Sequence, residues 1–136
     1  MVAKRVLSKL VAYGDRATLL TLSGDLGAGK TTLVQALAKE LGITEAIQSP
    51  TYVLMKKYEL YDQAFDALIH IDVYRLDNPV QFAALEPENL FASPRTLVAL
   101  EWPEKVEGAL PKADLVLKLS SDGAGEQERY ISIDSE

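Results

Sequence analysis

The chain has 136 residues, a length that suits one domain with a continuous buried core but leaves no room for a separate substrate domain. Hydrophobic residues make up 48% and charged residues 25%, which is a globular composition, and no apolar run reaches the length of a membrane span. The formal charge of -6 argues against broad contact with naked RNA or DNA, because such contact depends on lysine and arginine. We therefore expect a single domain over residues 1–136.

The chain has no cysteine, which excludes a disulfide framework and a thiolate metal site and suits the cytoplasm. Its basic start is not followed by an apolar core and a small-residue cleavage site, so no secretion signal is expected. We predict a cytoplasmic protein that does not associate with a membrane.

Three elements are predicted in the first third of the chain. A first helix is indicated by apolar residues at helical spacing, and Gly14 is placed to end it. Residues 18–22 form a β-prone run, which leads through a glycine-rich turn into a helix over residues 31–41 that Gly42 closes. A strand, a glycine loop and a helix in this order are the setting in which a phosphate-binding loop works. The apolar positions of the first helix are Val2, Val6, Leu7, Leu10 and Val11.

Further strands are predicted along the rest of the chain. Residues 51–60 can be extended, and residues 68–72 and 97–101 each predict a buried strand that ends in an acid. Two C-terminal strands, over residues 115–119 and 130–133, are joined by a glycine-containing turn. Several of these strands are separated by loops too short for a crossover helix, so some antiparallel pairing is expected.

A short helix is predicted between the two acid-ending strands. Asn78, Pro79 and Gln81 suit its N-cap, first turn and third position, and Pro87 breaks or restarts it. Alternating strands and helices around the glycine loop predict an α/β fold of the P-loop nucleoside triphosphatase type, with a mixed, mostly parallel sheet flanked by helices.

Residues 24–31 read Gly-Asp-Leu-Gly-Ala-Gly-Lys-Thr, which fits the Walker A pattern G-x-x-x-x-G-K-[ST]. The glycines let backbone amides turn inward, and these amides form an anion cradle with the positive end of the following helix. Lys30 places a cation near the β and γ phosphates, and the Thr31 hydroxyl can ligate magnesium. The sequence therefore predicts binding of ATP with Mg2+. The expected nucleotide contacts are Asp25, Leu26, Gly27, Ala28, Gly29, Lys30, Thr31 and Thr32.

Two strand-ending acids are candidates for the metal and the chemistry. Asp72 fits the acid that P-loop proteins place near magnesium, and its structural alternative is an aspartate that caps a turn. Glu101 can act as a general base or orient the attacking water, and its alternative is a solvent-facing strand end. Spacing favours the metal role for Asp72 about two to one and leaves the two interpretations of Glu101 balanced.

Four other residues have weaker signals. His70 lies inside an apolar run, where a hydrogen-bonded structural histidine is commoner than a catalytic one, so we expect a structural role. Trp102 can line a nucleotide pocket or pack against Pro103, and Arg75 can stabilise transferred charge or form a salt bridge. Thr51 follows the P-loop helix, where a switch that senses the γ-phosphate or a plain strand start is expected.

Four blocks taken together resemble the TsaE family, the bacterial ATPases required to make the threonylcarbamoyladenosine modification of tRNA. Their order and spacing cover most of the chain, which is more specific than the P-loop alone. The blocks are Gly-Asp-Leu-Gly-Ala-Gly-Lys-Thr-Thr at 24–32, Ser-Pro-Thr-Tyr at 49–52, His-Ile-Asp-Val-Tyr-Arg-Leu at 70–76 and Glu-Trp-Pro-Glu at 101–104. Residues 85–95 lack the glycine that the resemblance would place after the capped helix.

The resemblance implies roles for residues that the spacing leaves open. It makes Thr51 a switch residue and moves Trp102 toward the nucleotide pocket. Asp72 and Glu101 become metal-site or catalytic acids, with Thr31 as the third metal ligand. It also implies that the protein acts with the TsaB–TsaD complex, which ATP turnover resets between cycles, and that it meets tRNA only indirectly.

Two other functions remain open from the sequence. A small-molecule kinase shares the P-loop but needs an acceptor pocket and usually an arginine-rich lid, and the sequence has no arginine-rich segment. A nonhydrolytic module would use bound ATP only to present a surface to a partner. GTP is a weaker expectation than ATP because the sequence lacks an Asn-Lys-x-Asp guanine-reading motif. No obvious arginine finger is present, so slow hydrolysis is expected without a partner.

Overall fold

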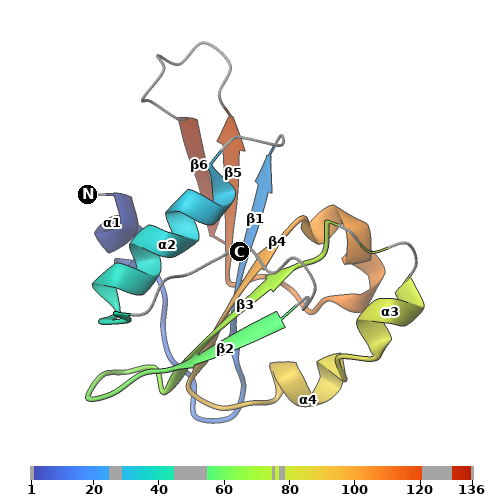
Figure 1. Ribbon diagram of the computed structural model, residues 1–136, viewed down its shortest axis with the longest axis horizontal. Coiled ribbons are helices and arrows are strands. Elements are labelled where there is room, and N and C mark those ends of the chain that lie inside the picture. The colour runs from blue at the N-terminus through green and yellow to red at the C-terminus, as the bar shows by residue number, and fades with distance from the viewer. Residues whose placement is uncertain are drawn as a thin grey trace.

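The computed structural model of the protein describes residues 2–24, 29–44, 55–74, 76, 79–120 and 130–135. In these residues six strands form one sheet in the order β2-β3-β4-β1-β5-β6 (Figure 1). Strands β3, β4, β1 and β5 are parallel, and the two edge strands β2 and β6 run antiparallel to their neighbours. The strands are β1 (Thr18–Gly24), β2 (Met55–Glu59), β3 (Ala67–Asp72), β4 (Thr96–Glu101), β5 (Leu115–Ser120) and β6 (Tyr130–Ser135).

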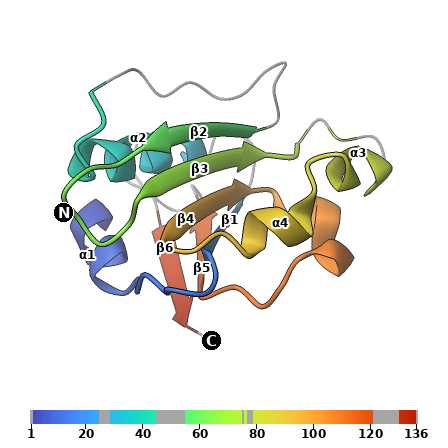
Figure 2. The same cartoon turned by 90° about the horizontal axis from the view of Figure 1, so that it is seen from below.

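Helices cover both faces of this sheet (Figures 1 and 2). Helices α1 (Val2–Ser8) and α2 (Lys30–Glu40) pack on one face. On the other face lie α3 (Pro79–Ala83), α4 (Pro87–Phe91) and the 3-10 helix η1 (Pro103–Ala109). Central parallel strands covered in this way are apolar on both faces, as the burial of every residue of β4 shows.

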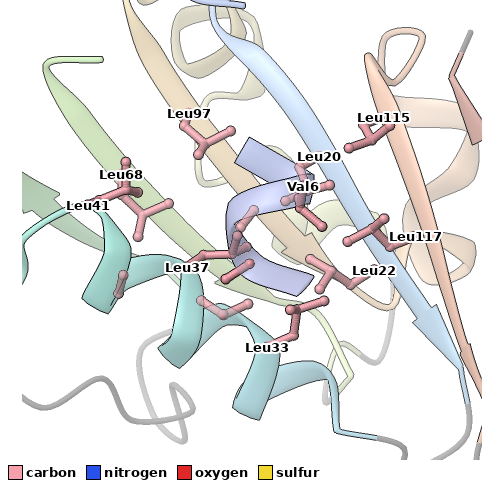
Figure 3. Packing of buried hydrophobic residues seen from close by; sticks show 14 of the residues in the cluster. Val6, Leu20, Leu22, Leu33, Leu37, Leu41, Leu68, Leu97, Leu115 and Leu117 are labelled. Carbon is pink, nitrogen blue, oxygen red and sulfur yellow. The ribbon is translucent and has the colours of Figure 1, made fainter. Parts of the chain in front are cut away.

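The core under α2 fixes the position of the phosphate-binding helix. Alternate residues of the strands point to this face, and Figure 3 shows Leu33 and Leu37 of α2 opposite Leu20 and Leu22 of β1. Leu37 is fully buried. Since truncation of such a leucine to alanine costs about 2–5 kcal/mol, this contact anchors α2 firmly against β1.

The predicted strands and the P-loop helix are confirmed where the structure describes them, with small shifts at their ends. The predicted extended residues 51–54, the N-cap Asn78 and the turn between β5 and β6 lie outside the described residues. Gly42 has a φ of 87° and ends α2 as expected. The first helix ends at Ser8, so the expectation that it extends to Gly14 is wrong. The Ser8 hydroxyl donates to the carbonyl of Arg5, a local bond that competes with helix continuation. Val11 is 58% exposed and lies outside the core.

Three residues other than glycine have a positive φ in the described part of the segment between β3 and β5: Glu86, Arg95 and Trp102. Glu86 has a φ of 54°, and Pro87 then starts α4, so the proline restarts a helix as predicted. Trp102 has a φ of 66° and precedes η1, a helix that the sequence did not predict. Glu86 and Trp102 both adopt a left-handed conformation that favours glycine. Among the helices described, none is long and apolar enough to cross a bilayer.

An ion pair fastens the start of β1 to the start of β5. Arg16 donates two hydrogen bonds to Asp114, of 2.9 and 2.8 Å, and the Leu19 amide donates to Asp114 Oδ2 at 2.8 Å. Burial alone would raise the pKa of the Asp114 carboxyl, but the bonds from Arg16 and Leu19 outweigh burial and lower it. This pair ties β1 to β5 at the end of the strand that lies away from Gly24.

We predict that Asp114→Asn lowers the free energy of unfolding by about 1–2 kcal/mol at neutral pH, because it weakens the charged hydrogen bonds between Arg16 and Asp114. The loss is no larger because the Arg16 side chain is partly exposed, and solvent screens its charge. The folded-state pKa of Asp114 is lowered, so its stabilisation is complete above about pH 4 and is lost as the pH falls through the folded-state pKa. Urea unfolding at several pH values measures both effects.

The control is Glu59→Gln, which removes an ion pair between Glu59 and Lys57 whose side chains are more than half exposed. It should change the free energy of unfolding by less than about 0.5 kcal/mol. Equal losses in the two variants at neutral pH, or a loss in Asp114→Asn that does not shrink as the solution is acidified, would contradict the role given to Asp114.

Candidate phosphate-binding site

The predicted functional residues meet at the carboxyl edge of the parallel strands. Strand β1 ends at Gly24, β3 ends at Asp72 and β4 ends at Glu101, and α2 begins at Lys30 beside them. Asp72 and Glu101 are opposite each other in the register of β3 and β4. Ligands of open α/β sheets bind at this edge, so the topology alone marks it as a candidate site.

The start of α2 has the geometry of an anion-binding helix end. Gly29 precedes the helix with a φ of 98° and no side chain caps it, and the first helical bond runs from the Leu33 amide to the Gly29 carbonyl. The first-turn amides therefore have no acceptor within the helix and carry its positive dipole end. Thr32 is exposed on this turn. Four predicted contacts lie outside the described residues: Asp25, Leu26, Gly27 and Ala28.

Gly24 is required at the end of β1 by its surroundings. Its φ is 142°, and a Cβ atom at this position would lie 2.3 Å from the backbone oxygen of Leu119 on β5. Real Cβ atoms do not approach oxygen so closely, and the obstacle is backbone that cannot rotate away. The first glycine of the Walker A pattern is therefore needed for strand packing as well as for the loop.

Lys30 is held at the base of the site. It is 5% exposed, and its Nζ donates to the Gly24 carbonyl at 2.8 Å. The same Nζ lies 4.1 Å from the centroid of the Trp102 ring, which places the cation against the face of the aromatic system. Tyr74 stacks on that ring with a centroid distance of 4.7 Å. Trp102 thus lies against the lysine of the Walker A pattern, and its predicted place in the nucleotide pocket stays a prediction.

Thr31 and Glu101 are in direct contact. The Thr31 hydroxyl lies 3.2 Å from Glu101 Oε1 and 3.1 Å from Oε2, although the two residues are 70 positions apart in the sequence. Glu101 is 2% exposed, so the alternative of a solvent-facing strand end is wrong. His70 Nε2 lies 2.5 Å from Glu101 Oε2, so the buried histidine contacts the candidate acid itself.

Asp72 has a structural bond as well as a suitable position. Its Oδ1 accepts a hydrogen bond of 2.9 Å from the Tyr74 amide, which is the turn-capping geometry of the structural alternative. Its place beside Glu101 in the register also agrees with the metal role. The metal role of Asp72 stays a prediction.

The side-chain atoms around Thr31 that could bind a metal ion are oxygens. A hydroxyl and a carboxylate in contact are the hard ligands that Mg2+ prefers. Among the described residues, no group of three or more acidic or histidine side chains is placed to hold a metal by itself. Mg2+ commonly binds through one or two carboxylates together with substrate phosphates, so Thr31 and Glu101 fit such an ion.

Two predicted residues cannot be placed, and two further residues emerge. Thr51 and Arg75 lie outside the described residues, so their predicted roles stay predictions. His70 and Tyr74 were missed as site residues. His70 precedes Asp72 by two positions on β3, and residues two apart on a strand share a face, so this spacing was a usable signal. Tyr74 had no such signal, because its contact depends on the turn after β3.

Comparisons with known proteins agree on one family. The family model described as "Threonylcarbamoyl adenosine biosynthesis protein TsaE" matches residues 2–131. The tRNA threonylcarbamoyladenosine biosynthesis protein TsaE of Haemophilus influenzae is 34% identical over 114 residues, which cover 84% of this chain and 68% of that protein. The protein of the same name from Bacillus subtilis is 33% identical over 129 residues, covering 95% of this chain and 77% of that protein.

A solved structure gives the same result for the fold. The crystal structure of YdiB from Bacillus subtilis superposes with a TM-score of 0.70 and 30% sequence identity, covering 98% of this chain and 78% of that chain. The mixed, mostly parallel sheet with a Walker A helix is thus a P-loop-type fold, as the sequence predicted. The family match over nearly the whole chain and the relatives in two bacteria lead to one conclusion: the chain belongs to the TsaE family of tRNA threonylcarbamoyladenosine biosynthesis proteins.

Proposed function

We propose that the protein is a magnesium-dependent ATPase that serves tRNA threonylcarbamoyladenosine biosynthesis together with the TsaB–TsaD complex. The observation that supports this most is the contact of Thr31 with Glu101 at the start of α2, directly after Lys30. It brings a phosphate-binding cation, a metal-binding hydroxyl and a buried carboxylate to one end of one helix.

Binding of the phosphates is assigned to the start of α2 and to Lys30. The first-turn amides and the helix dipole attract an anion, and the Lys30 ammonium is already desolvated beside the Gly24 carbonyl. A phosphate oxygen offers Lys30 a charged acceptor in place of a neutral carbonyl, and charged hydrogen bonds are about twice as strong as neutral ones. Trp102, in contact with Lys30, shields this cation from water.

Hydrolysis is assigned to Glu101 with Thr31 and Asp72 nearby. Bound Mg2+ would neutralise charge that develops on the phosphates. Thr31 and Glu101 supply the oxygen ligands, with Asp72 as the further acid at the end of β3. Glu101 binds the metal or holds the attacking water in line, and its burial keeps competing water away from the carboxylate.

Partner dependence follows from charge and size. A chain of 136 residues with a formal charge of -6 has little basic surface for gripping tRNA, so the partner complex is expected to bind it. Turnover is slow in the isolated chain, and the TsaB–TsaD complex accelerates it. ATP is proposed as the nucleotide because the sequence lacks the guanine-reading motif.

We predict that Lys30→Ala lowers Mg2+-dependent ATP hydrolysis at least about a hundredfold, because it removes a buried cation from the phosphates. Phosphate release is measured with the purified chain, alone and with the TsaB–TsaD complex. Lys39→Ala, an exposed lysine near the end of the same helix, is the matched control and should keep full activity.

The outcomes separate the proposed ATPase from its two alternatives. Hydrolysis that Lys30→Ala retains would contradict the phosphate site. Hydrolysis that is absent with and without TsaB–TsaD would favour the nonhydrolytic module, and a phosphorylated metabolite would favour the kinase.

We further predict that Glu101→Gln lowers kcat for hydrolysis by about a hundredfold or more while ATP still binds, since the amide can neither take a proton nor carry the carboxylate's charge. Trp102 is the chain's only tryptophan and contacts Lys30, so its fluorescence reports nucleotide binding. Glu104→Gln, an exposed acid three residues later, is the control and should leave kcat unchanged. Unchanged kcat in Glu101→Gln would remove Glu101 from the chemistry.

A further inference from the structure

His70 is the only histidine of the chain and is completely buried on β3. Its Nε2 atom lies 2.5 Å from Oε2 of Glu101, and the two side chains are 0% and 3% exposed. The bond joins residues 31 positions apart, on neighbouring parallel strands. This short and solvent-excluded contact is held in place by the pairing of β3 with β4.

The surroundings of the imidazole identify the nitrogen that carries a proton. His70 Nδ1 is buried and has no hydrogen-bond partner among the described residues. A proton on Nδ1 would be a buried unpaired donor, which costs about 1–3 kcal/mol. A proton on Nε2 is shared with Glu101 instead. Of the two neutral tautomers, the geometry therefore favours the one in which Nε2 donates to the carboxylate.

The bond from His70 also distinguishes the two oxygens of Glu101. In the part of the chain that the structure describes, Oε2 contacts both His70 and Thr31, whereas the contact of Oε1 is with Thr31. A short hydrogen bond to one oxygen restricts the rotation of a carboxylate about its last torsion. The other oxygen is then directed along the Thr31 side, where the start of α2 lies.

We propose that His70 is a positioning residue that fixes the orientation of the Glu101 carboxylate for ATP hydrolysis. This inference rests on the proposed ATPase function and deepens it. The histidine does not touch the nucleotide: it acts through Glu101, as histidine and carboxylate partners behind a reacting or metal-binding group commonly do. Its loss leaves phosphate binding at Lys30 intact and disorders the acid.

The first experiment measures the bond without turnover. In 15N-labelled protein the imidazole signals belong to His70 alone, because no other histidine exists. We expect a protonated Nε2 whose proton is shifted downfield by its hydrogen bond to Glu101. Glu101→Gln should move the Nε2 proton upfield, and the exposed-acid control Glu104→Gln should leave it in place. An Nε2 without a proton, or signals indifferent to Glu101→Gln, would overturn the inference.

The second experiment separates positioning from folding. His70→Leu removes the donor and fills similar space, and His70→Gln keeps an N–H donor at the end of the side chain. We expect kcat to fall about 10- to 100-fold in His70→Leu with KM for ATP changed less than about threefold, and partial recovery of kcat in His70→Gln. ATP binding, followed by Trp102 fluorescence, should stay within the same threefold range.

A stability control and a double variant complete the design. Leu68→Ala lies two residues earlier on the same strand and face and costs about 2–5 kcal/mol of stability, so it shows what destabilisation alone does to kcat. Adding His70→Leu to Glu101→Gln should lower kcat no further, because the histidine acts through that acid. Additive losses, or equal losses in Leu68→Ala, would assign His70 a structural role only.

The two proposals fail in different ways. If the wild type hydrolyses ATP and a folded His70→Leu keeps full kcat, the positioning role fails and the ATPase stands. If the wild type shows no hydrolysis, the ATPase fails, while the imidazole signals still report whether His70 holds Glu101. If His70→Leu does not fold, His70→Gln and the signals of the wild type carry the test.

Discussion

The register of β3 against β4 is the constraint on which the site depends. These parallel strands end together, so the side chains of His70, Asp72 and Glu101 point to the α2 face at one edge of the sheet. A carboxylate buried there is costly unless hydrogen bonds satisfy it, and His70 and Thr31 supply them. A shift of one residue between the strands would move these side chains to the opposite face and leave Thr31 without its acid.

The core and the site both result from the alternation of side chains between the two faces of β3 and β4. Leu68, Leu97 and Ala99 pack under α2, and the next residues on the same strand faces are polar. The apolar part fixes the depth and direction of α2, while the polar part begins where α2 begins. Close packing resists small displacements. The leucines under α2 therefore hold Thr31 in contact with Glu101, although they take no part in that contact.

Sequence reasoning predicted the local parts of this arrangement and missed the long-range ones. The Walker A pattern identified Lys30 and Thr31, because their roles follow from adjacent glycines and a helix start. Burial on both faces makes β3 and β4 nearly continuous apolar runs, which explains why these strands were found. The partnership of His70 with Glu101 depends on strand order, and composition does not encode which strands are neighbours. At the end of α1 the Ser8 side chain bonds to the Arg5 carbonyl, and the spacing of apolar residues does not predict such a bond.

The site also explains why strain occurs at Trp102. This residue must leave β4 directly after Glu101, and its amide donates to the Leu22 carbonyl on β1 while its ring covers Lys30. A glycine would relieve the positive φ but would give up the aromatic face against the cation. The strained turn, costing about 1–3 kcal/mol, is therefore the consequence of bringing an acid and an aromatic ring in consecutive positions to the same end of α2. Lys30, Glu101 and Trp102 thus form one unit, in which the backbone accommodates the strain so that both side chains reach the start of α2.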